Sequence, residues 1–248
     1  MPALLKDQAE QCAELIRRAE NISALTGAGI STSAGIPDFR GPQGLYVTRR
    51  YDPDTVFDIN YFRQNPKPFY QFARDFLTLE DKIRPTFAHK FLAGLEAKNK
   101  LQAVITQNID SLHQLAGSKN IFEMHGSFWS SRCLDCGEEF DFALMKKILL
   151  EEDIPECVCG GVIKPDIVFF GENVKYFNEA IDAAANSDLF FVIGTSCVVY
   201  PAAMVPQYTK GKIVVVNNSP VELTGKDVVL HVKEDIDEFF EKVAEILF

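Results

Sequence analysis

The chain has 248 residues, of which 47% are hydrophobic and 24% are charged, and its formal net charge is −10. That length and composition are typical of a globular protein with a sizeable core. The acidic balance argues against nucleic acid as a direct ligand, because phosphate contacts need clustered lysine and arginine. The N-terminus lacks the apolar run of a signal peptide, and polar residues and a proline interrupt the most apolar stretch, residues 189–206. We therefore expect a cytoplasmic protein that does not span a membrane.

Hydrophobic periodicity predicts that helices and strands alternate along most of the chain. In chain order, the pattern predicts a helix over residues 4–19, a strand over 22–26, helices over 66–79 and 87–98, and a strand over 101–106. A short helix ending at 116 and a strand over 121–124 follow. Strands over 166–170, 188–193, 212–216 and 228–232 then alternate with helices over 176–185, 202–208 and 237–247. Several of these strands are continuous apolar runs, which predicts an α/β fold with a doubly wound, mostly parallel, Rossmann-like sheet.

Small and polar residues follow the predicted strands, in the segments 26–29, 106–110, 124–126, 194–196 and 217–219. We expect these segments to converge, because ligands of such sheets bind beyond the carboxyl ends of the strands. Gly27 and Gly29 allow backbone N–H groups to meet a pyrophosphate, although their spacing is not the usual dinucleotide fingerprint and a plain tight turn is the alternative. The usual acid about 20 residues later is absent, and Asn217 stands at a later strand end. We therefore expect a dinucleotide in another pose and a reaction other than hydride transfer.

Four of the six cysteines form two closely spaced pairs between residues 133 and 159. Two short loops that each offer two thiolates are typical of a closed tetrahedral zinc site, and four thiolates leave no position for a catalytic water. The alternative is a set of scattered buried thiols. We predict a structural Zn²⁺ site, and expect Cys12 and Cys197 to be buried core residues. The predicted zinc ligands are Cys133, Cys136, Cys157 and Cys159.

Residues 27–41 read GAGISTSAGIPDFRG and resemble the signature of the sirtuins, the NAD-dependent protein-lysine deacylases. Residues 106–110, TQNID, with Leu112-His113 and Ala116-Gly117, resemble the second sirtuin motif. His125-Gly126, the cysteine pairs, FFGE at 169–172, GTS at 194–196 and Asn217 follow in the family's order. The resemblance spans about residues 22–236 and is strongest toward the compact bacterial and archaeal members.

The resemblance implies that an acyl-lysine carbonyl oxygen attacks C1′ of NAD while the nicotinamide–ribose bond breaks. It implies that Asn108 and His125 are catalytic, with His125 as the general base that takes a proton from the ribose. A structural histidine at a strand end is the alternative for His125, and His113 is expected to be structural. Ile109 and Asp110 would form the nicotinamide pocket, Arg40 would pair with a phosphate and Phe39 would shield the reacting face. The implied NAD contacts are Gly27, Ala28, Thr32, Phe39, Arg40, Gln107, Ile109, Asp110, His125, Gly194, Thr195, Ser196, Asn217, Asp235 and Ile236.

The resemblance also implies that an extended peptide adds as a strand between residues 168–172 and a segment near Val199, through main-chain hydrogen bonds. The implied substrate contacts are Val168, Phe170, Gly171, Glu172 and Val199. A buried core position is the alternative for Phe170. Some relatives read acidic acyl groups with a tyrosine and an arginine three residues later, where this chain has Tyr70 and Ala73. Arg74 is one step off, so we expect acetyl or other neutral acyl groups.

We expect three parts in the chain. These are a discontinuous NAD-binding Rossmann-like domain (residues 1–42, 86–125 and 165–248), a helical insertion (43–85) and a small zinc-binding module (126–164). Nothing in the sequence demands a dimer, so a monomer is favoured. Two other functions stay open: a protein mono-ADP-ribosyltransferase that uses the same NAD site, and a non-catalytic NAD-sensing zinc module.

Overall fold

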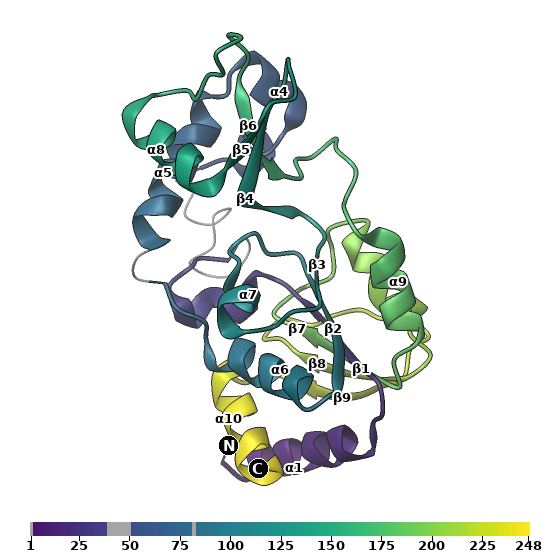
Figure 1. The fold of residues 1–248 in the computed structure, drawn as a ribbon. Helices are drawn as coiled ribbons and strands as arrows, with labels where there is room; N and C mark the ends of the chain where they lie inside the picture. The colour runs from purple at the N-terminus through teal and green to yellow at the C-terminus, as the bar shows by residue number, and fades with distance from the viewer. Residues whose placement is uncertain (1, 39–50, 81–82) are drawn as a thin grey trace. The chain divides into compact units, whose positions relative to one another are not determined.

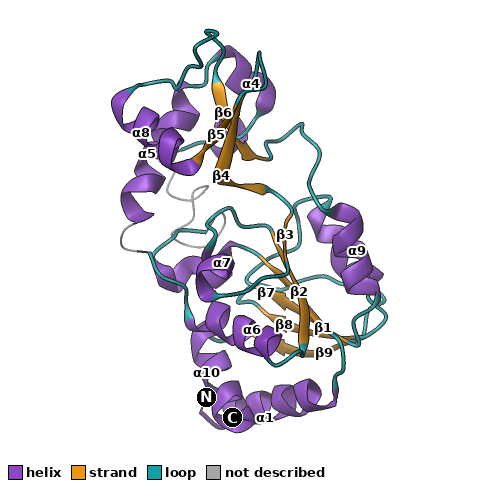
Figure 2. Cartoon of the chain, viewed as in Figure 1, coloured by secondary structure: helices purple, strands orange, loops and turns teal. Residues whose placement is uncertain are grey.

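The computed structural model describes residues 2–38, 51–80 and 83–248, and its course is drawn in Figures 1 and 2. Contacts within the chain divide it into two compact units. The first unit comprises Met1–Ile36, Arg84–Met124 and Tyr176–Phe248, and the second comprises Pro37–Ile83 and His125–Lys175. The residues that we expected to form a helical insertion and a separate zinc module therefore lie mostly in one unit.

The first unit contains a six-stranded parallel sheet. Its strands, in spatial order, are β3 (Ile121–Glu123), β2 (Leu101–Thr106), β1 (Ile22–Thr26), β7 (Leu189–Ile193), β8 (Lys212–Val216) and β9 (Val228–Val232). All residues of β1 and β7 are buried, as expected for strands that are covered on both faces. β7 is a continuous apolar run, whereas β1 also contains the buried polar residues Ser23 and Thr26. The parallel, doubly wound sheet predicted from the sequence is confirmed.

Helices cover both faces of this sheet. One face carries α1 (Pro2–Arg18), α6 (Phe87–Ala97), α7 (Leu112–Ala116) and α10 (Ile236–Leu247), and the other carries α9 (Phe177–Ala185) and the 3₁₀ helix η2 (Ala202–Tyr208) (Figure 1). The apolar stripe of α10, with Phe239 and Phe240, packs into the core shared with α1 and α6. Cys12 is fully buried in this core as expected, whereas Cys197 is only half-buried, because it lies on a loop after β7.

The strand order reverses direction between β1 and β7. From β1 the chain builds outward through β2 and β3, whereas β7, β8 and β9 extend the sheet on the other side. Loops that leave two neighbouring strands in opposite directions open a crevice at the carboxyl edge of the sheet. The glycine loop after β1 and the GTS segment after β7 lie at this point.

The second unit contains a three-stranded antiparallel sheet with the order β5 (Glu139–Asp141), β4 (Gly126–Cys133), β6 (Ile163–Ile167). Its helices are α3 (Pro53–Val56), α4 (Ile59–Gln64), α5 (Lys67–Glu80) and α8 (Phe142–Glu151). The side chains of Asp52, Asp58 and Asp141 cap α3, α4 and α8 by accepting backbone N–H groups in the first turn. An aromatic cluster, defined here as Phe57, Phe62, Phe69, Phe72 and Phe169, forms much of the core.

One predicted strand lies in a different sheet. We expected residues 166–170 to resume the strand–helix alternation of the parallel sheet, but β6 ends at Ile167 and pairs antiparallel with β4. The physical reason is that the two cysteine loops return the chain alongside β4, where backbone pairing is immediately available.

Within the described ranges, no helix has both the length and the apolar content that crossing a bilayer requires.

Candidate active site

The loops that follow β1 and β7 approach each other closely. Gly29 N–H donates to the Gly194 carbonyl oxygen at 2.9 Å, and Gly27 N–H donates to Ile193 at 3.0 Å. A Cβ atom on Gly29 would lie 2.7 Å from the Gly194 Cα, and one on Gly194 would overlap the backbone at Ile30. The glycines after β1 therefore serve the close approach of two backbones, which explains why their spacing differs from the usual fingerprint.

Asn108 and Asp110 lie at the carboxyl end of β2 and share one polar network. Asn108 Nδ2 lies 3.2 Å from the Gly27 carbonyl oxygen and 3.2 Å from Asp110 Oδ2. Ser31 Oγ donates to the same carboxylate oxygen at 2.6 Å, and Leu112 N–H donates to Oδ1 at 2.9 Å. Burial raises the pKa of the Asp110 carboxyl, and the hydrogen bonds from Ser31, Leu112 and Asn108 oppose that rise. The network orients two predicted site residues against the glycine loop.

Sequence reasoning did not single out Ser31 as a site residue. Its side chain is fully buried and its hydroxyl also lies 3.1 Å from Asn108 Nδ2, so it links the glycine loop to the Asn-Ile-Asp segment. The one sequence signal that could have identified Ser31 as a site residue was its position within residues 27–41, which resemble the sirtuin signature. A buried hydroxyl in a loop needs a partner, and only the fold shows which partner it finds.

Two threonines and a histidine lie beneath this network. Thr26 Oγ1 donates to Thr106 Oγ1 at 2.9 Å, and His113 Nε2 lies 2.9 Å from Thr26 Oγ1. Thr106 Oγ1 in turn accepts the Asn108 N–H at 3.1 Å. His113 therefore supports the strand ends from within the core, in agreement with the structural role expected for it.

The remaining predicted NAD residues of the first unit lie at other strand ends. Gln107 Nε2 donates to Thr195 Oγ1 at 3.0 Å, which joins the ends of β2 and β7. Asn217 follows β8, and its side-chain amide donates to the Ser219 carbonyl oxygen at 2.9 Å. Asp235 caps α10, which begins at Ile236, by accepting the Glu238 N–H. Among the other predicted NAD residues, Ala28, Ile109 and Ser196 are half-buried, and Thr32 Oγ1 donates to the Gly29 carbonyl oxygen at 3.0 Å. Val199, a predicted substrate contact in the same unit, is also half-buried.

His125 belongs to the second unit, where it is joined to the predicted substrate segment. Its carbonyl oxygen accepts the Val168 N–H at 2.8 Å, and the next residue, Gly126, pairs with Ile167. Gly126 has φ +68, and a Cβ there would overlap the Asp166 carbonyl oxygen. The strand ladder therefore holds the backbone of the proposed general base beside the backbone of the proposed peptide-binding segment.

The predicted substrate residues 168–172 form an extended segment followed by a turn. Phe170 N–H donates to the Phe57 carbonyl oxygen at 2.7 Å, and the Phe170 carbonyl oxygen accepts the Ile59 N–H at 3.1 Å. The Phe170 side chain is 44% exposed, so it is not a core residue. Phe39 and Arg40 lie outside the described residues, and their predicted roles stay predictions.

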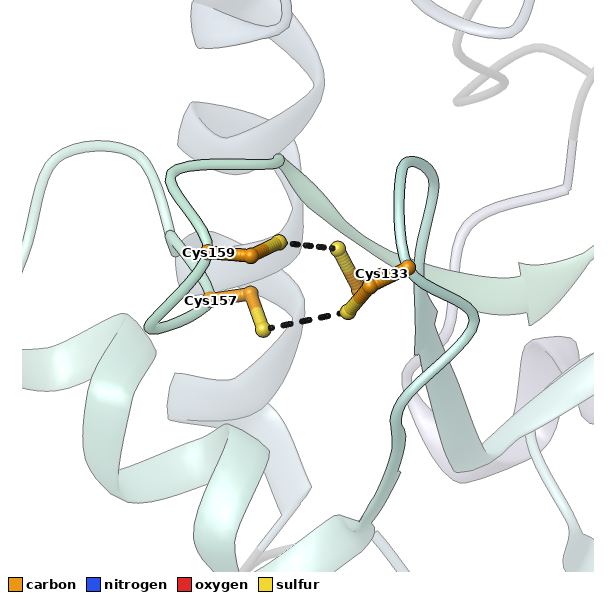
Figure 3. A group of neighbouring side chains, drawn as sticks. Cys133, Cys157 and Cys159 are labelled. Atoms are coloured by element: carbon orange, nitrogen blue, oxygen red, sulfur yellow. Dashed lines mark hydrogen bonds between the residues drawn. The ribbon is translucent and has the colours of Figure 1, made fainter.

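The four predicted zinc ligands lie together in the second unit. Their sulfur atoms are all within 4.8 Å of one another, and the Cys133–Cys159 and Cys136–Cys157 pairs are 3.5 and 3.6 Å apart (Figure 3). Four sulfurs bound to one tetrahedral zinc ion at about 2.3 Å are about 3.8 Å apart. A Cβ on Gly161 would lie 2.7 Å from Cys133 Sγ, so the loop leaves room for the thiolates only with glycine there. The donor set and its spacing fit a closed structural zinc site.

Comparison with known proteins identifies the family. The sequence model of the Sir2 family matches residues 27–201. The chain belongs to the Sir2 family. It is 43% identical over 227 residues to the NAD-dependent protein deacetylase of Caldivirga maquilingensis, covering 89% of this chain and 87% of that protein. It is 42% identical over 239 residues to the NAD-dependent protein deacetylase of Thermotoga maritima, covering 94% and 95% of the two chains.

Solved Sir2 structures have the same fold as this Sir2-family chain. A Sir2 variant with a deacetylated p53 peptide and 3′-O-acetyl ADP-ribose superposes with a TM-score of 0.88 at 40% identity, covering 96% of this chain and 98% of the other. A complex of Sir2, p53 peptide and NAD⁺ superposes with a TM-score of 0.87 at 40% identity, covering 96% and 97%. The α/β architecture predicted from the sequence is therefore that of the solved Sir2 structures.

We predict that removal of zinc unfolds the second unit. Metal-free thiolates leave the two cysteine loops without the cross-link that closes them, so a strong chelator should lower the Tm by more than about 5 °C. The Cys136→Ser variant should lose bound zinc, whereas Cys197→Ser, which leaves all four ligands in place, should keep about one zinc per chain. Zinc content by atomic emission and melting by circular dichroism are the measurements. Melting that is unchanged by chelation would contradict a structural zinc.

We also predict a pH dependence of stability from the buried pair His89 and His113, whose ring centres are 4.6 Å apart. Burial lowers the pKa of His89 to about 3 and holds that of His113 well below its usual value. As the pH falls below about 6.5, the unfolded state binds protons that the folded state excludes, so stability present at neutral pH is lost toward pH 3.

Each histidine should contribute up to about 1.4 kcal/mol per pH unit to this loss. The measurement is urea unfolding at pH 7 and pH 5, with His89→Gln as the comparison. The free energy of unfolding of His89→Gln should fall by about 2 kcal/mol less than that of the wild type over this range. Identical pH slopes in the two proteins would show that His89 is not the titrating group.

Proposed function

We propose that this chain is an NAD-dependent protein-lysine deacetylase. It transfers the acyl group of a modified lysine to the ADP-ribose part of NAD and releases nicotinamide and free lysine. The observation that carries the proposal is its 40–45% identity with curated NAD-dependent protein deacetylases over most of both chains. The chain also has Asn108 and His125 at the positions for which the sirtuin resemblance implies a catalytic role. NAD is consumed in this reaction and is therefore a substrate.

The first unit supplies the proposed NAD site. Its parallel sheet reverses order between β1 and β7, which is where open α/β sheets bind nucleotides. Gly27, Gln107 and Thr195 lie at this crevice, and Asn108 and Asp110 are held there by the network through Ser31. Short polar groups that are already held in place can orient ribose hydroxyls and the nicotinamide carboxamide without further ordering. Arg40 is proposed to pair with a phosphate, and Phe39 to keep water from the reacting face.

His125 is proposed as the general base. It would take a proton from the ribose after the acyl oxygen has attacked C1′, so that the 2′-hydroxyl can attack the alkylimidate. A half-buried imidazole suits this role near neutral pH, and the ladder from His125 to Val168 gives its backbone one defined position. The oxocarbenium-like transition state requires a dry and shaped site.

The proposed peptide site is the segment 168–172, together with Val199. Phe170 presents an exposed ring while its backbone is paired with Phe57 and Ile59. A segment held in this way can accept an extended peptide by main-chain hydrogen bonds, which give affinity with little dependence on sequence. Acyl-lysine side chains of proteins are therefore the proposed partners. A monomeric state, a cytoplasmic location and the absence of nucleic-acid or membrane binding stay predictions.

The second unit supports neutral rather than acidic acyl groups. Tyr70 is fully buried and its hydroxyl donates to the Ile163 carbonyl oxygen, so this hydroxyl is already used within the core. Ala73 is also fully buried, and Arg74 donates to the carbonyl oxygens of Glu152 and Asp153 at the end of α8. None of these three residues offers a cation for an acyl carboxylate.

The central test is a product assay with NAD and an acetyl-lysine peptide. The wild type should release nicotinamide, remove the acetyl group and form O-acetyl-ADP-ribose, all read by mass spectrometry. His125→Ala should lower kcat by at least about 100-fold, because the proton acceptor is lost, while the circular dichroism spectrum is unchanged.

Other outcomes of this assay separate the alternatives. A mass gain on the acceptor protein would indicate a mono-ADP-ribosyltransferase. NAD binding without any nicotinamide release would indicate a sensor. Loss of folding in His125→Ala would indicate that His125 is a structural residue.

A panel of acyl peptides tests the acyl specificity. Acetyl and propionyl peptides should be turned over with kcat/KM at least about tenfold above that of a succinyl peptide, because a buried carboxylate without a cationic partner is costly. The propionyl peptide is the control for acyl size. Equal kcat/KM for succinyl and acetyl peptides would show that another residue receives the acyl carboxylate.

A further inference from the structure

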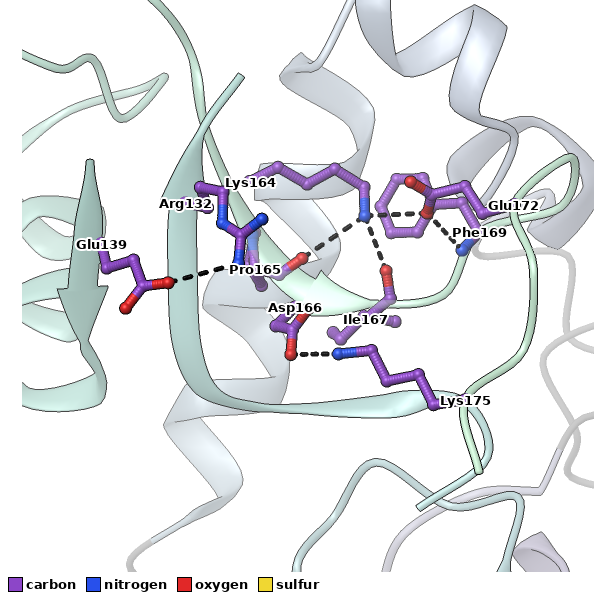
Figure 4. Close-up of polar contacts among 9 residues, drawn as sticks. All are labelled: Arg132, Glu139, Lys164, Pro165, Asp166, Ile167, Phe169, Glu172 and Lys175. Carbon is purple, nitrogen blue, oxygen red and sulfur yellow. Dashed lines mark hydrogen bonds and ion pairs between the residues drawn. The ribbon is translucent and has the colours of Figure 1, made fainter. Parts of the chain in front are cut away.

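A charged residue is buried in the second unit beside the proposed peptide segment. Lys164 lies on β6, and only 6% of its surface is exposed. Its ammonium group donates to the Ile167 carbonyl oxygen at 2.6 Å and lies 2.9 Å from Glu172 Oε2. It also lies 4.1 Å from the centre of the Phe169 ring (Figure 4). A desolvated ammonium group needs hydrogen-bond acceptors, a carboxylate or an aromatic ring as partners, so these three contacts hold the Lys164 side chain in place.

Glu172 uses the same carboxylate oxygen twice. Besides pairing with Lys164, Oε2 accepts the Phe169 N–H at 2.8 Å, while Glu172 N–H donates to the Phe169 carbonyl oxygen at 2.9 Å. Gly171, with φ +94, allows the chain to turn between them. The carboxylate is therefore directed toward Lys164 and the Phe169 backbone, and it closes the turn formed by residues 169–172 (Figure 4).

The turn separates two neighbouring aromatic side chains. Phe169 is 1% exposed, and its ring centre lies 4.9 Å from that of Phe69 in the aromatic cluster. Phe170 is exposed instead, although its backbone is paired with Phe57 and Ile59. The Lys164 ammonium contacts Phe169 from β6, so the buried cation and the aromatic cluster together set the direction in which Phe170 is presented.

We propose that Lys164 and Glu172 are positioning residues for the acyl-lysine substrate. The ion pair between the buried Lys164 and the partly exposed Glu172 holds residues 169–172 in the one conformation in which Val168 and Phe170 can receive the peptide. This inference rests on the proposed function and changes the role expected for Glu172, which acts through the turn instead of contacting the peptide with its carboxylate. Because most of the proposed NAD contacts lie in the first unit, the pair controls peptide binding and not NAD binding.

Steady-state kinetics with an acetyl-lysine peptide and NAD test this assignment. Lys164→Met removes the charge but keeps a long side chain, and it should raise KM for the peptide about tenfold or more, with KM for NAD within about twofold. Lys164→Arg should restore most of the loss, because a guanidinium can pair with Glu172 and stack on Phe169. Lys175→Met is the matched control. It removes the more exposed ion pair with Asp166 on the same segment, and both KM values should stay within about twofold.

A second variant keeps the test decisive if Lys164→Met does not fold. Glu172→Gln keeps the shape of the side chain and an acceptor for the Phe169 N–H, and it should give the same peptide-specific rise in KM. The two changes combined should cost no more than Lys164→Met alone, because both remove one interaction.

An unchanged peptide KM in the folded variants would overturn the assignment, as would equal rises in the KM values for peptide and NAD, which indicate a general structural role. A wild type that does not turn over the acetyl peptide would overturn the proposed function itself, and this assignment with it.

Discussion

The proposed NAD site depends on the contact between two backbones at the point where the sheet reverses its strand order. Gly29 and Gly194 approach so closely that neither position has room for a Cβ atom. This contact fixes the loop after β1, whose Gly27 carbonyl oxygen then lies against Asn108, and it brings Thr195 within reach of Gln107. The strand ends are thus joined by hydrogen bonds between short groups, which lose little conformational freedom on ordering.

The two units hold their functional segments by different physical means. In the first unit, hydroxyl and amide groups of Ser31, Thr106 and Asn108 satisfy one another and a single carboxylate. In the second, a buried lysine and Glu172 hold a turn, with an aromatic ring against the cation. The network in the first unit spreads one carboxylate over several hydrogen-bond donors, whereas the second unit sets one cation against one carboxylate. Removing either partner of such a pair leaves a charge without compensation, so the pair holds one conformation strictly.

Much of the fold could be predicted, because buried strands appear in the sequence as apolar runs and the proposed zinc site appears as two closely spaced cysteine pairs. The glycine and Asn-Ile-Asp segments could be assigned to one crevice for the same reason, since parallel strands end at the same edge. The strand expected over 166–170 could not be placed correctly, because a short apolar run does not reveal whether its partner is parallel or antiparallel. Ser31 and Lys164 were missed because a buried polar residue has no periodic signature of its own.

The sequence by itself determined the family and the doubly wound sheet, and it singled out the four cysteines that the fold brings together and the residues proposed for NAD and peptide. These predictions follow from residue types and their spacing along the chain, because strands, loops and closely spaced cysteine pairs are formed by residues that are near one another in sequence. Only the tertiary structure decided which side chains face one another. It showed that the Tyr70 hydroxyl donates to the Ile163 carbonyl oxygen and that the Glu172 carboxylate pairs with Lys164. Such contacts join residues distant in the chain, and the packing of the whole unit selects them from many partners of equal chemistry.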